Sequence, residues 1–378
     1  MKIKNLSRRL AENEEHTGQI TWRSPSNIAI VKYWGKYGIQ LPRNPSISFT
    51  LNKAFTETTL SYKTKEKKDD NISLEFYFEG HENEAFRIKQ VKFLSSLHDI
   101  FPFLTQLDLK IESHNSFPHS AGIASSASSM SALALCLCTL ENQIFHKNTD
   151  STSLWNIPKQ SGDYRERGEN FLKKASYLAR LGSGSACRSV YPIMAQWGKM
   201  KSVKGSSNDY AIPYESEIHP IFKTYHDDIL IISKGEKSVS SRMGHGLMDN
   251  NPYAKPRYAQ ANTRMDILLK ALKGGDIETF GQIAEDEALT LHALMMTSSP
   301  SFTLLKPNTL KMIEILRGYR EATKTPVFFT LDAGPNLHLL YPHAFENQVK
   351  TLIDNELKKY CENEQVIFDV VGQGATMV

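Results

Sequence analysis

The sequence has few cysteines and no long hydrophobic segment. Its four cysteines form no Cys-x-x-Cys pair, which argues against a disulfide framework and favours a reducing compartment. No stretch approaches the roughly 18 consecutive apolar residues that indicate a membrane-spanning helix. Residues 1–17 are polar and charged and lack the apolar core of a signal peptide. We therefore expect a cytoplasmic protein without a membrane span.

The sequence also lacks a strong charge imbalance and the spacing of a metal site. It contains 45 basic and 41 acidic residues, a net charge of +4. Its densest basic cluster, residues 63–68, is followed at once by two aspartates, so we interpret it as a solvated hairpin loop rather than a nucleic-acid surface. Twelve histidines include no His-Glu-x-x-His pattern, so the metal ligands stay unknown. The mild basic excess suits a cleft for small polyanions.

The 378 residues are enough for two domains or one large bilobed unit. A shift to Lys, Ser and Gly at residues 201–213 favours domains at 1–210 and 211–378. We predict an α+β protein with mostly antiparallel sheets backed by helices. Alternating apolar residues predict strands at 20–31, 47–51, 55–62, 72–78, 107–113, 190–197, 228–233, 327–331 and 337–340. Helical periodicity predicts helices at 84–97, 125–140, 164–179, 254–273 and 276–296.

A loop of small residues leads into a predicted helix at residues 118–127, which read Pro-His-Ser-Ala-Gly-Ile-Ala-Ser-Ser-Ala. Gly122 and Ala124 allow backbone N–H groups to approach a phosphate, and the helix N-terminus adds partial positive charge. Ser125 and Ser126 add hydroxyl groups that suit a phosphate or a metal ion. Ordinary helix capping explains the same serines, and no Walker-type Gly-Lys-Ser/Thr follows.

A second glycine-serine loop, residues 182–189, ends in Ala-Cys-Arg-Ser before an apolar strand. Ser183 and Ser185 expose hydroxyl groups, and the planar fork of Arg188 matches a carboxylate bidentately. The alternative is a flexible Gly-Ser linker. The Ala-Cys-Arg ending is unusual for a linker, so the sequence favours an anion-binding loop.

Two further segments carry groups suited to catalysis. Residues 26–36 end in Lys-Tyr-Trp-Gly-Lys, where Tyr33 and Lys36 offer a hydroxyl and a cation suited to a diphosphate tail. Asp332 follows an apolar strand in an Asp-Ala-Gly-Pro-Asn turn, where it can act as a base or orienting group. A surface aromatic-lysine cluster and an ordinary turn aspartate are the respective alternatives.

Together these motifs resemble the diphosphomevalonate decarboxylase family of the superfamily that includes galactokinase, homoserine kinase, mevalonate kinase and phosphomevalonate kinase (GHMP). Residues 118–127 match its phosphate loop with Ile123 in place of Leu, and residues 238–244 resemble its Val-Ser-Ser-x-x-Gly-Met loop. The Lys-Tyr-Trp-Gly-Lys and Asp-Ala-Gly-Pro-Asn runs also match in order, so the resemblance spans nearly the whole chain. It implies a two-lobed GHMP-kinase-like fold with an N-terminal ATP-binding domain, a C-terminal domain carrying the catalytic aspartate, and a deep active-site cleft between the lobes.

The resemblance implies ATP-dependent decarboxylation of (R)-5-diphosphomevalonate in isoprenoid biosynthesis, with ATP and Mg²⁺ as cofactors, and a homodimer. Asn27 is then expected to orient the carboxylate of Asp332. The implied catalytic residues are Asp332, Arg188 and Asn27. The implied substrate-binding residues are Tyr33, Lys36, Ser183, Ser185, Arg188, Ser241 and Arg242. The implied ATP-binding residues are Ser113, Asn115, Gly122, Ala124, Ser125 and Ser126.

Three alternatives stay open. A relative with these motifs could decarboxylate mevalonate 5-phosphate or mevalonate, it could stop after phosphorylating the 3-hydroxyl, or it could be a non-catalytic ligand sensor. The chain also departs from the family at two places. Tyr191-Pro192-Ile193-Met194 replaces Tyr-Gly-Gly-Phe and removes two flexible residues, and His245 replaces a methionine. We expect these departures to affect substrate detail rather than family membership.

Overall fold

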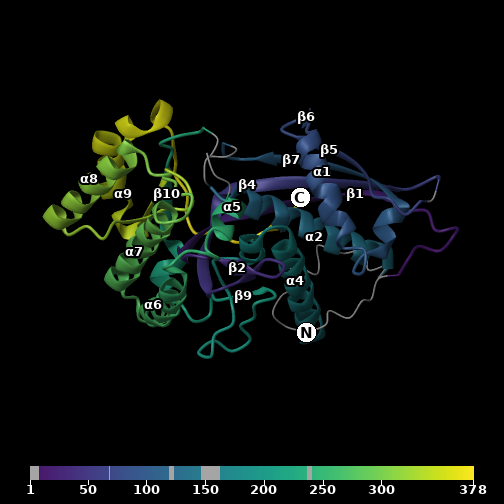
Figure 1. Ribbon diagram of the computed structural model, residues 1–378, viewed down its shortest axis with the longest axis horizontal. Helices are drawn as coiled ribbons and strands as arrows, with labels where there is room; N and C mark the ends of the chain where they lie inside the picture. Colours follow the sequence, from purple (N-terminus) through teal and green to yellow (C-terminus); the bar gives the residue numbers. More distant parts are fainter. Residues whose placement is uncertain (1–7, 68, 119–122, 146–161, 236–240) are drawn as a thin grey trace.

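The computed structural model describes residues 8–67, 69–118, 123–145, 162–235 and 241–378, with the backbone alone at 162–167 and 241–242 (Figure 1). Within these residues the larger sheet has the strand order β14-β1-β4-β7-β5-β6, and β8 and β9 extend it beside β4. The strands are β1 (Thr17–Val31), β4 (Ser46–Thr64), β5 (Ser73–Phe78), β6 (His81–Glu82), β7 (Leu107–Asn115), β8 (Met194–Trp197), β9 (Ala211–Pro213) and β14 (Thr376–Met377).

Helices α1 (Glu84–Ser95), α2 (Ser125–Phe145) and α4 (Gly162–Gly182) cover this sheet (Figure 1). Helix α2 is buried around most of its circumference because its sequence is apolar on nearly every side. It packs between α4 and the two longest strands, β1 and β4. The short helices η1 (Pro102–Gln106) and η2 (Gly184–Arg188) flank this core.

The second sheet lies in the C-terminal half and has the order β11-β12-β10-β13. Its strands are β10 (His226–Leu230), β11 (Phe328–Thr330), β12 (Leu337–Tyr341) and β13 (Val366–Ile367). The longer helices near it are α6 (Ala254–Gly274), α7 (Ile277–Met296) and α8 (Pro307–Thr323). Shorter elements are β2 (Lys36–Tyr37), β3 (Leu41–Pro42), α5 (Ser241–Gly246), α9 (Glu346–Leu352), η3 (Pro220–Thr224), η4 (His343–Phe345), η5 (Ile353–Leu357), η6 (Lys358–Tyr360) and η7 (Glu362–Glu364).

The two halves meet through one hydrophobic core. Ile28 and Phe49, from β1 and β4, pack in the same cluster as Tyr225 and Phe280 of the second half. The carboxylate of Asp369 accepts the backbone N–H groups of residues 52–54, in the middle of β4. The C-terminal end of β1 is therefore held against α7, which in turn packs on β11, the strand that precedes Asp332.

The structure confirms the α+β class and the mostly antiparallel sheets; among the described pairs, β5–β7 is parallel. The two strands predicted at 47–51 and 55–62 are one strand, β4. The hairpin predicted at residues 63–68 is wrong, because β5 pairs with β7 rather than with β4. Lys65 in that segment is buried and bonds Asp69, so its charge is satisfied locally.

The predicted division at residues 210 and 211 stays a prediction. Strand β9, just beyond it, pairs with β8, and β14 at the end of the chain pairs with β1. The N-terminal sheet therefore recruits two segments from beyond residue 210. None of the described helices has the length and apolar character needed to cross a bilayer.

Candidate active site

The predicted catalytic carboxylate lies beside a lysine from the other half of the chain. Lys32 follows β1, and its buried Nζ atom lies 3.1 Å from Oδ1 of Asp332. The carboxylate of Asp332 is 24% exposed, so a ligand can reach it. Its backbone carbonyl accepts the N–H of Gly334 and lies 3.1 Å from Nε2 of His292. These contacts fix the turn from which the carboxylate projects.

A buried ionic network holds Lys32 in place. Glu287 of α7 accepts the backbone N–H of Lys32 at 2.9 Å and pairs with Arg257 and Arg264. Burial opposes ionisation of Glu287, but the hydrogen bonds and charge of Arg257 outweigh it and hold the pKa of this carboxyl below its ordinary value. Arg257 also donates to the carbonyl of Lys32. The backbone of Lys32 is therefore clamped from both sides.

Burial lowers the pKa of Lys32, and the nearby carboxylate of Asp332 counteracts part of this effect. Sequence reasoning missed both Lys32 and Glu287. Lys32 stood within the Lys-Tyr-Trp-Gly-Lys run, where a cation directly after a buried apolar strand was an available signal. Glu287 had no such signal, because its partners lie on α6 and at the end of β1.

Arg188 is a second buried cation, on η2. Its guanidinium donates to Ser48 Oγ at 2.9 Å, Ser46 Oγ at 2.6 Å and Asn27 Oδ1 at 3.2 Å. All these partners are neutral, and no ion pair of Arg188 with a carboxylate is found among the described residues. Burial lowers the pKa of Arg188, while Cys187 and then Asp332 oppose the shift. Its charge therefore lies within the electrostatic reach of Asp332.

Asn27 is placed to hold Arg188 rather than Asp332. Its Oδ1 atom accepts from Arg188, and its Nδ2 donates to Ser189 Oγ at 2.7 Å and to the carbonyl of Ser185 at 3.3 Å. These bonds occupy both donors of the amide. The contact expected between Asn27 and Asp332 is therefore replaced by one that fixes the arginine.

The ring of Tyr33 packs against Gly184 of η2, the short helix that also carries Arg188. A Cβ atom on Gly184 would lie 2.8 Å from the Tyr33 ring, so only glycine permits this approach. The ring also packs on Trp197 and His245, with centroids 4.7 and 4.2 Å away. The Tyr33 hydroxyl is buried without a hydrogen-bond partner among the described residues. Such a group is stabilised by a polar ligand.

His245, which replaces the family's methionine, has a defined role. Its Nδ1 accepts the backbone N–H of Gly35 at 3.0 Å, and its ring packs on Trp34 at 4.6 Å. Burial, with a smaller contribution from Lys36, lowers the pKa of His245 to about 3. A neutral imidazole thus holds the turn that contains Tyr33. Lys36 itself donates to Gln40 at 3.1 Å.

The backbone at the other departure keeps a glycine-like conformation. Ile193 has φ +58°, in the left-handed region that glycine prefers. Its N–H donates to the carbonyl of Gly372, and its carbonyl accepts from Thr50. Ile193 therefore occupies a left-handed position at which a β-branched residue is strained.

The described part of the predicted phosphate loop is pinned to β1 and to the Gly-Ser loop. Ser26 donates to the carbonyl of Ile123 at 2.6 Å, and Ala124 adopts φ +46° directly before α2. Ser125 begins α2, and Ser126 Oγ lies 3.3 Å from Ser183 Oγ. The two predicted anion-binding loops are therefore adjacent. Gly122 lies outside the described residues, as do the side chains of Ser241 and Arg242.

The predicted nucleotide contacts lie on β7. Ser113 Oγ is 3.0 Å from Thr58 Oγ1, so the two hydroxyl groups form a hydrogen bond between the neighbouring strands β7 and β4. Asn115 accepts from Thr56, while its Nδ2 is buried without a partner among the described residues. That amide offers a donor for a ligand.

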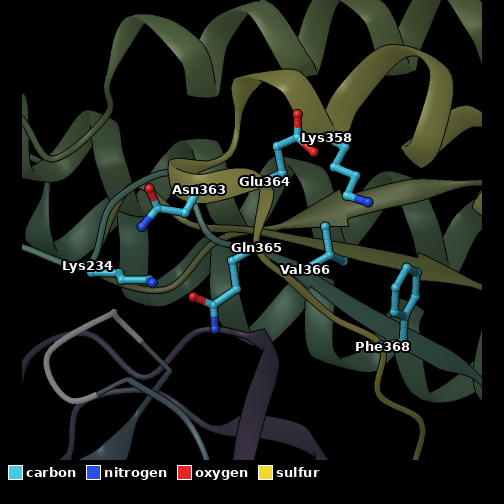
Figure 2. A pocket seen from close by; sticks show the side chains of 7 residues that line it. All are labelled: Lys234, Lys358, Asn363, Glu364, Gln365, Val366 and Phe368. Carbon is cyan, nitrogen blue, oxygen red and sulfur yellow. The ribbon is translucent and has the colours of Figure 1, made fainter.

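A pocket of about 380 Å³ is lined by residues of the C-terminal half (Figure 2). It contains none of the predicted site residues. Its lining consists of Lys234, Lys358, Asn363, Glu364, Gln365, Val366 and Phe368.

Comparison with known proteins identifies relatives of both halves. Residues 24–162 match the diphosphomevalonate decarboxylase-like N-terminal domain, and residues 228–374 match the mevalonate 5-diphosphate decarboxylase C-terminal domain. The diphosphomevalonate decarboxylase of Saccharomyces cerevisiae is 29% identical over 350 residues, which cover 89% of this chain and 80% of that protein.

Solved structures agree with these matches. The mevalonate diphosphate decarboxylase of Staphylococcus aureus superposes with a TM-score of 0.76 at 28% identity, covering 96% of this chain and 98% of that one. The relative MDDEF, in complex with MVAPP, AMPPCP and magnesium, gives 0.75 at 28% identity, covering 96% and 99%. Both halves, the fold and the order of the motifs thus lead to one assignment: this chain belongs to the diphosphomevalonate decarboxylase family.

Proposed function

We propose that this protein catalyses ATP-dependent decarboxylation of (R)-5-diphosphomevalonate to isopentenyl diphosphate, CO₂, ADP and phosphate. One observation carries the proposal. A partly exposed carboxylate, Asp332, lies beside the buried cation Lys32, and a second buried cation, Arg188, has only neutral hydrogen-bond partners among the described residues. A reaction that activates a hydroxyl and releases CO₂ from a carboxylate is served by such groups, with Asp332 as proton acceptor and Arg188 as the site of the substrate carboxylate. The complex of the relative with MVAPP, AMPPCP and magnesium supports this choice of reactants.

Asp332 is the group that acts on the 3-hydroxyl of the substrate. A tertiary alcohol is hindered and weakly acidic, so its attack on the γ-phosphate of ATP requires alignment and a proton acceptor. Lys32 fixes Oδ1 of Asp332 through the 3.1 Å contact. A neighbouring cation favours the ionised form of a carboxylate, which is the form that accepts a proton.

Arg188 is placed to bind the carboxylate that leaves as CO₂. Ser46, Ser48 and Asn27 orient its guanidinium. A substrate carboxylate would supply the missing anionic partner. When phosphate leaves C3, positive charge develops there and the carboxylate gives up its bonding electrons. Arg188 holds that group in line with the departing phosphate.

The phosphate loop is the proposed ATP site. Ala124, Ser125 and Ser126 lie at the start of α2, where backbone N–H groups and the helix dipole favour phosphate oxygens. Serine hydroxyls and phosphate oxygens form the oxygen-rich donor set that Mg²⁺ prefers, and a bound Mg²⁺ would neutralise phosphate charge. The unpartnered Nδ2 of Asn115 suits a nucleotide acceptor. Gly122 and Ser113 complete the proposed ATP contacts.

The diphosphate of the substrate is assigned to residues around Tyr33. Its buried hydroxyl donates to a phosphate oxygen, and Lys36 supplies a cation. Ser183 and Ser185 lie on the adjacent loop, beside Gly184 that contacts the tyrosine ring. We assign Ser241 and Arg242 to the same clamp on the family resemblance alone.

We further propose a cytoplasmic homodimer without a nucleic-acid partner. All four cysteines are buried and unpaired, which suits a reducing compartment. The dimer rests on the family resemblance. Light scattering on purified protein tests it, since a monomer at micromolar concentration contradicts the proposal.

The decisive experiment measures CO₂ and ADP with mevalonate, its 5-phosphate and its 5-diphosphate. We expect coupled release of both products with the 5-diphosphate and turnover at least about 100-fold slower with the others, because they lose charge-assisted hydrogen bonds of the clamp. Preference for the monophosphate, ADP without CO₂, or no ADP with any of the three would each favour one of the alternatives and contradict the proposal.

A further inference from the structure

The C-terminal half contains a cluster of two histidines and a glutamate outside the candidate active site. His226 begins β10, His343 begins η4, and Glu346 begins α9. Nε2 of His226 lies 2.9 Å from Nδ1 of His343 and 4.0 Å from Oε2 of Glu346. Nδ1 of His343 lies 3.4 Å from the same oxygen. These three atoms lie within 4.8 Å of one another, so a single ion can contact them all.

We propose that His226 Nε2, His343 Nδ1 and Glu346 Oε2 bind a divalent transition metal, with Zn²⁺ the best fit. Two imidazole nitrogens and one carboxylate oxygen form a common zinc ligand set, with water at a fourth position. Imidazole donors disfavour Mg²⁺ and Ca²⁺, which prefer oxygen ligands. The site is therefore chemically distinct from the magnesium expected with ATP.

The cluster is partly organised for binding. His226 is buried, and its ring lies parallel to that of Tyr341 with centroids 4.7 Å apart. Lys350 bonds Oε1 of Glu346 and leaves Oε2 directed at the histidines.

Metal binding requires a small local change. The histidine rings are parallel with centroids 5.2 Å apart, so they meet edge to edge through one N–H···N hydrogen bond. Each ring places its proton on the other nitrogen when both lone pairs face an ion. His343 is 66% exposed and can rotate to admit a metal 2.0–2.1 Å from each nitrogen, in the range typical of zinc.

The location predicts a stabilising rather than a catalytic role. Asp332 and His343 flank opposite ends of β12, which separates them by roughly 17 Å at strand spacing. His226 also pairs with Val370, beside the Asp369 carboxylate that holds the middle of β4. A metal at this site ties β10 and α9 to the junction between the two halves.

The test uses full-length protein without an affinity tag, treated with EDTA and dialysed, in the absence of nucleotide. Zn²⁺ is titrated in competition with a chromophoric chelator, and Co²⁺ absorption reports the coordination geometry. We expect one Zn²⁺ per chain with a dissociation constant in the micromolar range or below, unaffected by millimolar Mg²⁺. Absence of a stoichiometric site at these concentrations overturns the proposal.

Variants locate the ion. His343→Ala and Glu346→Gln change exposed or half-exposed side chains, so both are expected to fold, which circular dichroism checks. We expect each to weaken Zn²⁺ binding at least 10-fold while Co²⁺ loses its tetrahedral absorption. His98→Ala, an exposed histidine of the N-terminal half, serves as the matched control and should bind as the wild type does. Equal binding by all three variants places the ion elsewhere and contradicts the site.

Discussion

Lys32 and Arg188 are both about 2% exposed, and burial lowers the pKa of each, yet their surroundings differ. Lys32 is paired with Asp332, and Glu287 and Arg257 hold its backbone. Arg188 is surrounded by hydroxyl and amide oxygens that orient it without neutralising it. A buried charge is costly unless it is paired. The cost of burying the charge of Lys32 is offset within the fold by Asp332. The cost of burying the charge of Arg188 is fully offset only when a ligand supplies an anion.

The largest expected effect comes from removing the anion beside Lys32. Asp332→Asn should lower the rate of the chemical step by about 10² to 10⁴-fold, the usual contribution of a positioned general base. ATP and substrate should still bind within a few-fold of wild type, because Asp332 belongs to neither proposed clamp. Single-turnover CO₂ release and calorimetric titration measure the two quantities. A near-normal rate would show that the carboxylate is structural only.

The next effect tests the network behind Lys32. Glu287→Gln leaves the buried Arg257 without its carboxylate and removes one of the two carboxylate partners of the partly exposed Arg264, so we expect a loss of about 3–5 kcal/mol in the free energy of unfolding. Asp286→Asn, at the neighbouring position, removes a half-exposed partner of Arg264 and should cost less than about 1 kcal/mol. Urea denaturation compares both. Equal losses for the two variants would mean that the buried ion pairs of Glu287 stabilise the fold no more than the exposed ion pair of Asp286.

His245 holds the turn that contains Tyr33, near Arg188. Its titration makes the stability of the folded protein depend on pH. The pKa of His245 is about 3 in the folded protein and near 6.5 when unfolded. The unfolded chain therefore takes up the proton first, and stability falls as pH decreases below about 6.5. One such group removes about 2 kcal/mol between pH 6.5 and 5.

His245→Asn tests this sign. The variant should be less stable at pH 7.5 but should lose less stability on acidification, so the difference between the two proteins narrows toward pH 5. His98→Asn, at an exposed position, should leave the wild-type slope unchanged. Parallel curves for wild type and His245→Asn would mean that the imidazole is not held neutral.

The smallest effect concerns the backbone after Arg188. Ile193→Gly relieves a left-handed conformation worth about 1–2 kcal/mol but removes a partly buried side chain, so we expect a net change within about 1 kcal/mol. Ile212→Gly removes an equally placed side chain from the regular strand β9 and should destabilise by about 2–3 kcal/mol. Thermal unfolding compares the pair, and equal losses would rule out strain at Ile193.

Local patterns were sufficient to predict most of the fold. Apolar periodicity identified most of the longer strands and helices, since each buries one face or is wholly buried. Helix α8 was missed, and the strand predicted at 190–197 begins only at Met194. The pairing of β5 with β7 was missed, because sequence adjacency favours a hairpin and a parallel neighbour leaves no local signal. The recruitment of β14 to the first sheet was missed for the same reason: it joins segments at opposite ends of the chain.

The candidate site was predictable where its residues form short motifs. Each of three predicted residues stands in a compact motif: Asp332, Arg188 and Tyr33. In the structure, the charges of Asp332 and Tyr33 both influence the pKa of Arg188. Ser46, Ser48 and Glu287 were missed because a hydroxyl on a strand or a helix glutamate is ordinary in sequence. Their roles arise only when β4 and α7 meet the cations. Asn27 was found, but its partner was misjudged because only the folded β1 places it beside Arg188.

Arg188 is proposed to bind the carboxylate of the substrate, which supplies its anionic partner. Binding of mevalonate 5-diphosphate and of its carboxamide analogue, measured calorimetrically without ATP, tests it most directly. We predict that the wild type prefers the carboxylate at least about 10-fold and that Arg188→Gln, folded as judged by ATP binding, loses this preference. The same preference in both proteins would contradict the claim.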